Sequence, residues 1–123
     1  MRRMVLGAPR KLPTELTRGV VEHCVLALVS DGEAYAFDIV RTLGARGLVT
    51  SEGTIYPLLA RLRRDGLVTT DWRESDAGPP RRYYRITAEG RRALDAFAAD
   101  WSALRDAVDG LLPAAPRRGG RPA

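Results

Sequence analysis

The arginines of one short segment carry the clearest chemical signature in the chain. Residues 61–92 contain nine arginines and five acidic residues, a local net charge of +4. The whole chain of 123 residues carries +5, but residues 1–13 supply +4 and residues 113–123 supply +3, so its central part is otherwise acidic. A basic segment inside an acidic domain indicates a polyanionic partner such as nucleic acid.

The only histidine and the only cysteine are adjacent, which raises the possibility of a metal site or a catalytic pair. Neighbours on a helix point about 100° apart, so His23 and Cys24 would not converge on one ligand, and zinc usually takes four nitrogen or sulfur ligands. No phosphate-binding loop or nucleophile elbow is present, and the acidic residues of the last helix read as a solvated flank. We therefore expect no metal, no cofactor and no enzymatic activity.

Apolar residues at helical spacing predict three short helices, over about 14–30, 33–43 and 51–65. Thr14 is the expected N-cap of the first helix and Ser51 that of the third. Glycines are expected to end these helices or to form turns: Gly32, Gly44, Gly47 and Gly66. The side chains predicted to face the core are Leu16, Val20, Val21, Cys24, Val25, Leu28, Tyr35, Ile39, Val40, Leu43, Ile55, Leu58, Leu59 and Leu62.

A β-hairpin and a long helix are predicted to follow. The β-forming residues 67–72 and 82–87 read as two strands, and residues 74–80 between them read as a loop. Thr87 is the expected cap of a last helix that Pro113 ends. That helix carries a heptad stripe of large apolar side chains: Leu94, Phe97, Trp101, Leu104, Val108 and Leu111. The rest of the chain is too small to cover this stripe, so we expect a homodimer.

The predicted fold is mainly α with a small β-hairpin, a winged helix-turn-helix followed by a long C-terminal dimerisation helix. We expect a basic flexible arm over residues 1–13, the winged unit over 14–87, the dimerisation helix over 88–112 and a disordered basic tail over 113–123. No apolar stretch approaches the length of about 20 residues that spans a bilayer, and a lone cysteine fits a reducing compartment, so we expect a cytoplasmic protein.

The third helix and the hairpin are the predicted contacts with double-stranded DNA. Burying the apolar stripe of that helix leaves a polar face of suitable size for a major groove. The residues expected at the groove are Ser51, Thr54, Tyr56, Pro57 and Arg61. The residues expected on or near phosphates are Arg64, Arg73, Arg81, Arg82 and Arg85. Arg82 and Tyr84 also fit a second interpretation, in which they brace the hairpin from its buried side.

Two sequence blocks resemble the PadR family of bacterial transcriptional regulators. They are Gly53-Thr54-Ile55-Tyr56-Pro57-Leu58-Leu59 and Arg82-Tyr83-Tyr84-Arg85-Ile86-Thr87, and the likeness extends over about residues 16–112. With its single C-terminal helix the chain is similar to the short, one-domain subfamily. The resemblance implies a homodimeric repressor, in which the last helix packs against the partner subunit and two winged units bind a pseudo-palindromic operator.

Two alternatives accompany this interpretation. In drug-binding members of the family, tryptophans at similar positions line a pore at the dimer centre. The resemblance therefore implies a ligand-binding role for Trp72 and Trp101. It also implies that a small aromatic or drug-like inducer releases the protein from DNA. Packing is the favoured role of Trp101. The other alternative is a winged-helix module that binds a protein or a ligand and no DNA, because fold alone does not decide function.

Overall fold

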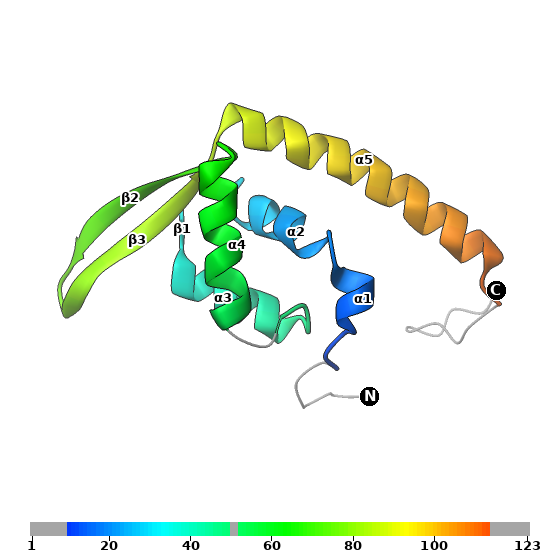
Figure 1. The fold of residues 1–123 in the computed structure, drawn as a ribbon, viewed down its shortest axis with the longest axis horizontal. Helices are drawn as coiled ribbons and strands as arrows, with labels where there is room; N and C mark the ends of the chain where they lie inside the picture. The colour runs from blue at the N-terminus through cyan, green and yellow to red at the C-terminus, as the bar shows by residue number, and fades with distance from the viewer. Residues whose placement is uncertain (1–9, 50–51, 114–123) are drawn as a thin grey trace.

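The structure, a computed structural model, describes residues 10–49 and 52–113. In these ranges the chain forms α1 (Thr14–Thr17), α2 (Val21–Leu28), β1 (Ala34–Tyr35), α3 (Ala36–Ala45), α4 (Glu52–Arg64), β2 (Val68–Ser75), β3 (Gly78–Ile86) and α5 (Ala88–Leu111). Helices α2, α3 and α4 lie together, the β2–β3 hairpin projects to one side, and α5 runs across the top and beyond them (Figure 1). The predicted winged helix-turn-helix with a long last helix is confirmed.

The core lies between α2, α3, α4 and the base of the hairpin. Its fully buried large side chains come from each of these elements: Val25, Leu26, Val29, Ile39, Leu43, Ile55, Leu59, Leu62 and Val68. Most of the predicted core positions are therefore confirmed, and Cys24, Val40 and Leu28 pack against this cluster as partly buried side chains.

The first predicted helix is wrong in its continuity and in its cap. A break separates α1 from α2 because Gly19 adopts φ +82°, a conformation that few other residues take without strain. Pro13, not Thr14, is the N-cap of α1 and gives no side-chain hydrogen bond. The break turns α1 away from the core, so Leu16 is 71% exposed.

The second predicted helix begins three residues too early. Ala34 and Tyr35 form the short strand β1, which pairs with Tyr84 and Tyr83 of β3, and α3 starts only at Ala36. The three-stranded sheet has the order β1-β3-β2. A two-residue strand has too little sequence to show a period, so only its partner strand reveals it.

Both strands of the hairpin, which we call the wing, are longer than predicted. The ladder continues through Arg73 opposite Arg81 to Ser75 opposite Gly78, with a register shift between these pairs. Pro79 and Pro80 lie within β3 at this point, where the missing N–H of proline favours a bulge over regular pairing. The predicted loop over 74–80 is therefore wrong except at its tip.

The junction between the wing and α5 is tightly packed. Thr87 caps α5 as predicted, because its hydroxyl accepts a hydrogen bond of 2.9 Å from the N–H of Gly90. The same hydroxyl donates to the carbonyl of Gly66 over 2.7 Å. A Cβ on Gly90 would lie 2.1 Å from the carbonyl oxygen of Leu67, so only glycine fits where α5 crosses the base of the wing.

Some predictions fall on residues outside the described ranges. These predictions are Ser51 as an N-cap and most of the flexible arm and disordered tail, at residues 1–9 and 114–123. Within the described part of the arm, the N–H of Leu12 donates to the carbonyl of Gly47 over 2.9 Å, which fastens the start of the chain to the turn after α3.

Candidate nucleic-acid interface

Helix α4 has one face in the core and one face in solvent. Ile55, Leu59 and Leu62 recur at helical spacing and are fully buried. The predicted groove residues Thr54, Tyr56, Pro57 and Arg61 are exposed, as is Arg64 at the end of the helix. Proline has no N–H, so Pro57 leaves the carbonyl of Gly53 without its usual helical donor on this open side. The structure therefore brings five of the predicted DNA contacts to one exposed helix surface.

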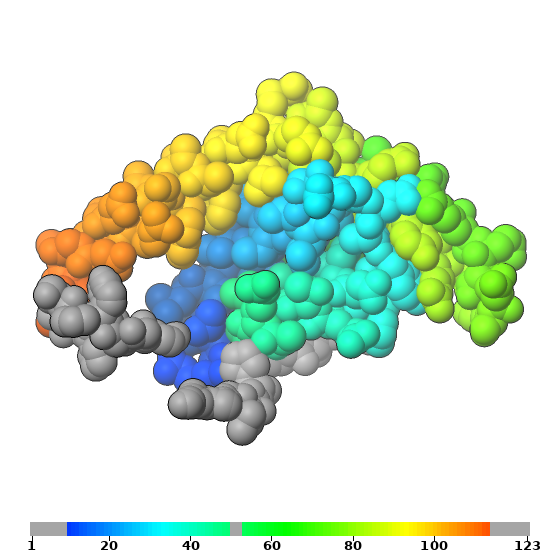
Figure 2. All heavy atoms as spheres, turned by 180° about the vertical axis from the view of Figure 1, so that it is seen from behind, coloured from blue at the N-terminus to red at the C-terminus, as the bar shows by residue number. Residues whose placement is uncertain are grey.

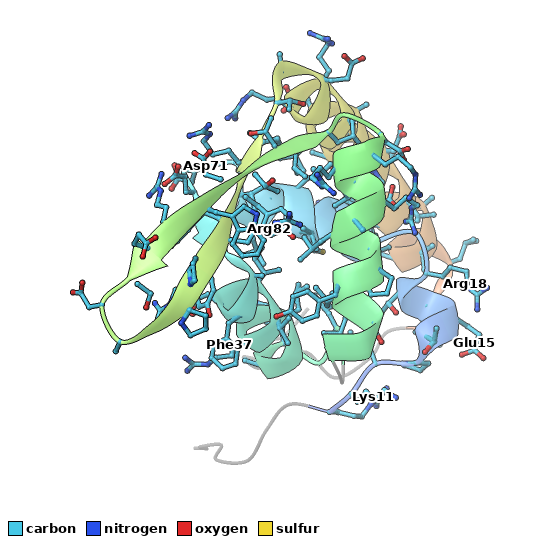
Figure 3. All side chains as sticks on the ribbon, turned by 60° about the vertical axis from the view of Figure 1, so that its left-hand side comes forward. Lys11, Glu15, Arg18, Phe37, Asp71 and Arg82 are labelled. Carbon is cyan, nitrogen blue, oxygen red and sulfur yellow. The ribbon has the colours of Figure 1, made fainter. Side chains whose placement is uncertain are left out.

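One face of the wing looks toward α4. The register sets Val68 opposite Ile86, Thr70 opposite Tyr84 and Trp72 opposite Arg82, so these six side chains share a face. Val68 and Tyr84 are buried in the core. Figure 3 shows Arg82 between the wing and α4, with Asp71 on the other side of the hairpin. Among the predicted phosphate contacts of the wing, Arg82 is the one on the α4-facing side.

The opposite face of the wing is rich in arginine and tyrosine. Arg73, Arg81 and Arg85 alternate with the α4-facing residues and so lie on this outer face. The guanidinium of Arg73 lies 5.0 Å from the ring centre of Tyr83, and that of Arg81 lies 4.8 Å from the ring centre of Tyr35. Such cation–π contacts fix the position of an arginine without neutralising it.

Two glutamates hold three of the arginines that are predicted to contact DNA, two on the wing and one on α4. Glu33 pairs with Arg73 and, over 3.0 Å, with Arg85, so one carboxylate bridges both strands of the wing. Glu22 of α2 pairs in the same way with Arg61 of α4. All three guanidinium groups are about half exposed, and exposed ion pairs contribute only about 0–1 kcal/mol each. These arginines can therefore exchange a carboxylate for a phosphate at little cost.

Glu22 and Glu33 were missed in the sequence because their partners are distant in the chain. Arg61 lies 39 residues after Glu22, while Arg73 and Arg85 follow Glu33 by 40 and 52. No local pattern reports such pairs. The pairing of Trp72 with Arg82 could have been predicted from the sequence, because joining the two predicted strands as a hairpin places these residues opposite each other.

The predicted dimerisation stripe begins in the core and ends in solvent. Leu94 packs against the core cluster, and the ring of Phe97 stacks on His23 of α2 at 4.2 Å. Beyond this point Trp101, Leu104 and Leu111 are 41%, 55% and 85% exposed. Figure 2 shows open space between the last turns of α5 and the N-terminal part of the chain. A large apolar surface thus stays uncovered within one chain.

His23 and Cys24 have different surroundings in the structure. His23 is engaged by Phe97, and its Nδ1 lies 3.1 Å from the carbonyl oxygen of Gly19. Burial raises the pKa of the Cys24 thiol, and the nearby charge of Arg46 lowers it by less, so the thiol stays protonated and a poor nucleophile. Within residues 10–49 and 52–113, no group of three His, Cys, Asp or Glu side chains is arranged to hold a metal ion.

The two tryptophans have different surroundings within one chain. Trp72 is 62% exposed on the wing, where the guanidinium of Arg82 covers its ring at 4.6 Å. Trp101 lies on α5 with its ring centre 6.2 Å from that of Phe97. A cavity of about 250 Å³ between α1, α2 and α4 includes Thr54 and Arg61 in its lining, and neither tryptophan.

None of the helices in the described part of the chain is long and apolar enough to cross a membrane.

Comparison with known proteins gives a consistent result. Residues 25–96 match the Transcriptional regulator PadR-like family. A protein of Mycobacterium tuberculosis named as a transcriptional regulator is 39% identical over 80 residues, which are 65% of this chain and 74% of that protein.

Solved structures show the same likeness. A PadR-like transcriptional regulator from Bacillus cereus has a TM-score of 0.74 and 34% identity, over 82% of this chain and 99% of that one. A PadR family transcriptional regulator from Eggerthella lenta has a TM-score of 0.70 and 37% identity, over 82% and 88% of the two chains.

Proposed function

Because this chain belongs to the PadR-like family of transcriptional regulators, which is not a family of enzymes, we propose that it is a homodimeric repressor that binds a pseudo-palindromic operator in the cytoplasm. The observation that supports this proposal is the placement, side by side, of the two elements that were predicted from the sequence to contact DNA. The exposed polar face of α4 lies next to the wing, and Arg82 lies between them (Figure 3).

Helix α4 enters the major groove in this proposal. Thr54 and Pro57, which have small side chains, lie on its exposed surface, and a major groove about 12 Å wide admits a helix. Thr54 and Tyr56 then approach base edges from the N-terminal half, where the helix dipole favours negative groups, and Arg61 approaches them from the last turn of α4. Arg64 follows at the other end of α4 and contacts the phosphate backbone.

The wing enters the adjacent minor groove, which has a phosphate strand on each side. Its α4-facing side then presents Arg82 to the backbone between the two grooves. Its outer face presents Arg73, Arg81 and Arg85 to the backbone on the far side. Phosphate contacts of this kind set the register of the protein on DNA and make binding dependent on salt.

Pairing of two chains through α5 completes the site. The uncovered stripe of Trp101, Leu104, Val108 and Leu111 is covered by the same stripe of a second chain around a two-fold axis. Such a dimer presents two α4 helices to two half-sites that lie about one helical turn, or a multiple of it, apart.

Titration of the upstream DNA of the protein's own gene, followed by fluorescence anisotropy at several salt concentrations, tests this function. The proposal predicts two chains per site and binding at least about 10³-fold tighter than to scrambled DNA of the same composition. Equal and weak binding to both DNAs would contradict it and would favour the module that binds a protein or ligand without DNA.

Glu33→Gln is expected to strengthen DNA binding about 3- to 10-fold at low salt. Glu33 lies near the wing and holds Arg73 and Arg85, so its charge both competes with phosphates and repels them. Anisotropy titration of the variant against the same DNA measures the change. Glu89→Gln is the matched control, because it removes an equal charge from a residue whose ion pair, among the described residues, is with Arg92 on α5. Weaker binding by Glu33→Gln would show instead that the ion pairs are needed to hold the wing in place.

Release of DNA by a small planar aromatic ligand is a second candidate, favoured by one observation. Trp101 is 41% exposed beside the ring of Phe97, in the surface that the partner covers. Planar aromatic compounds are then expected to quench the Trp101 fluorescence of a Trp72→Phe variant and to weaken operator binding. Absence of quenching by any member of a panel of such compounds would assign Trp101 to packing alone.

A further inference from the structure

The wing arginines differ in what holds them. Arg73 and Arg85 lie against carboxylates, and Arg81 lies over Tyr35 on the outer face. Arg82 alone among them is on the α4-facing side, where its guanidinium lies 4.6 Å from the ring centre of Trp72. Among the described residues no acidic side chain pairs with it, so its full charge remains available to a ligand.

Part of the Arg82 guanidinium also lacks a polar partner. Its Nε is buried and has no hydrogen-bond acceptor within the described structure. Buried polar groups in proteins nearly always have a partner, so the hydrogen-bonding capacity of Arg82 is only partly used by the described residues. The surrounding protein supplies an aromatic surface for this arginine instead of an oxygen.

The placement of Trp72 is otherwise unexplained. The ring is 62% exposed in the middle of strand β2 and is not part of the buried core, although exposure of a large apolar side chain is unfavourable in water. The strand register sets it directly opposite Arg82 on the same face. An aromatic ring in contact with a guanidinium restricts the positions that the arginine can take, and it does not use up the N–H donors that bind a phosphate.

We propose that Trp72 is a positioning residue that holds Arg82 on the α4-facing side of the wing, where Arg82 contacts the phosphate backbone between the two grooves. This inference rests on the proposed function, since it concerns the same DNA interface. It gives Trp72 a role in DNA binding that does not involve a small ligand.

The test combines variants of both residues in salt titrations against the upstream DNA. Arg82→Ala is expected to lower the slope of log K against log salt by about two for a dimer, one for each lost phosphate contact. Trp72→Ala is expected to weaken binding about 3- to 10-fold at physiological salt, and Trp72→Phe, which keeps a flat ring, to restore most of that loss. Arg105→Ala on α5 is the control for loss of an arginine away from the wing.

A double-mutant cycle separates positioning from a general structural effect. Because Trp72 acts through Arg82, adding Trp72→Ala to Arg82→Ala is expected to cause no further loss. Three results would each overturn the inference. They are an equal loss of affinity on adding Trp72→Ala with and without Arg82, an unchanged salt slope for Arg82→Ala, and full DNA binding by Trp72→Ala. Failure of the unmodified protein to prefer its upstream DNA would instead reject the proposed function. Circular dichroism of each variant confirms that the fold is intact.

Discussion

Leu104→Asp combined with Val108→Asp is expected to convert the protein into a folded monomer that no longer binds its operator specifically. Both side chains are exposed within one chain, at 55% and 41%, so the charges do not disturb the core. In the proposed dimer the same carboxylates would be buried without partners, which opposes association strongly. Losing the second half-site then removes a factor of about 10²–10⁴ in affinity.

Sedimentation or light scattering gives the mass, and anisotropy gives the affinity. The matched control is Ala99→Asp with Ser102→Asp, which adds the same charges to exposed positions on the other side of α5. The control is expected to remain a dimer with operator affinity within about twofold of the unmodified protein, when both are measured at about 0.15 M salt, which screens the added negative charges. If the Leu104→Asp, Val108→Asp variant stayed dimeric, the apolar stripe of α5 would not be the dimer interface.

Gly90→Ala is expected to lower the free energy of unfolding by about 3 kcal/mol or more, near the upper end for overpacking. The added methyl carbon would lie 2.1 Å from the carbonyl oxygen of Leu67 and 2.8 Å from Cγ1 of Ile86. One of these neighbours is backbone, so α5 must move away from the base of the wing. The Thr87 cap and the position of the wing are then disturbed together.

The same substitution near the other end of the helix is the control for this prediction. Gly110 has nothing within 4 Å of its Cβ position, so Gly110→Ala is expected to leave stability unchanged or raise it by up to about 0.5 kcal/mol through helix propensity. Urea unfolding at one fixed protein concentration compares the two, because the stability of a dimer depends on concentration. Equal stability of both variants would mean that the packing at Gly90 is looser than the structure shows.

Local patterns predicted most of the fold and most of the α4 surface. The apolar stripe of α4, the cap at Thr87 and the left-handed Gly66 are all features of short sequence stretches, and the structure has each of them. These signals are strong because neighbouring residues determine them.

The missed features depend on residues that are far apart in the chain or on backbone geometry. Strand β1 exists only because β3 pairs with it, and Glu33 acquires its role from arginines 40 and 52 residues away. Pro79 and Pro80 resembled a loop, but the ladder extends past them through a bulge. The spacing of apolar residues continues unbroken past Gly19, so it predicted one helix there. The positive φ of Gly19 interrupts that helix, and the sequence does not show which conformation a glycine takes.

Hydroxyl-radical footprinting on the upstream DNA tests most directly whether two winged units bind one operator. A dimer that presents two winged units is expected to give two protected patches related by a dyad, with centres about one helical turn or a multiple of it apart. Both patches should disappear together in the Leu104→Asp, Val108→Asp variant. A single patch that this variant leaves unchanged, or uniform weak protection along the fragment, would contradict the dimeric operator-binding protein described above.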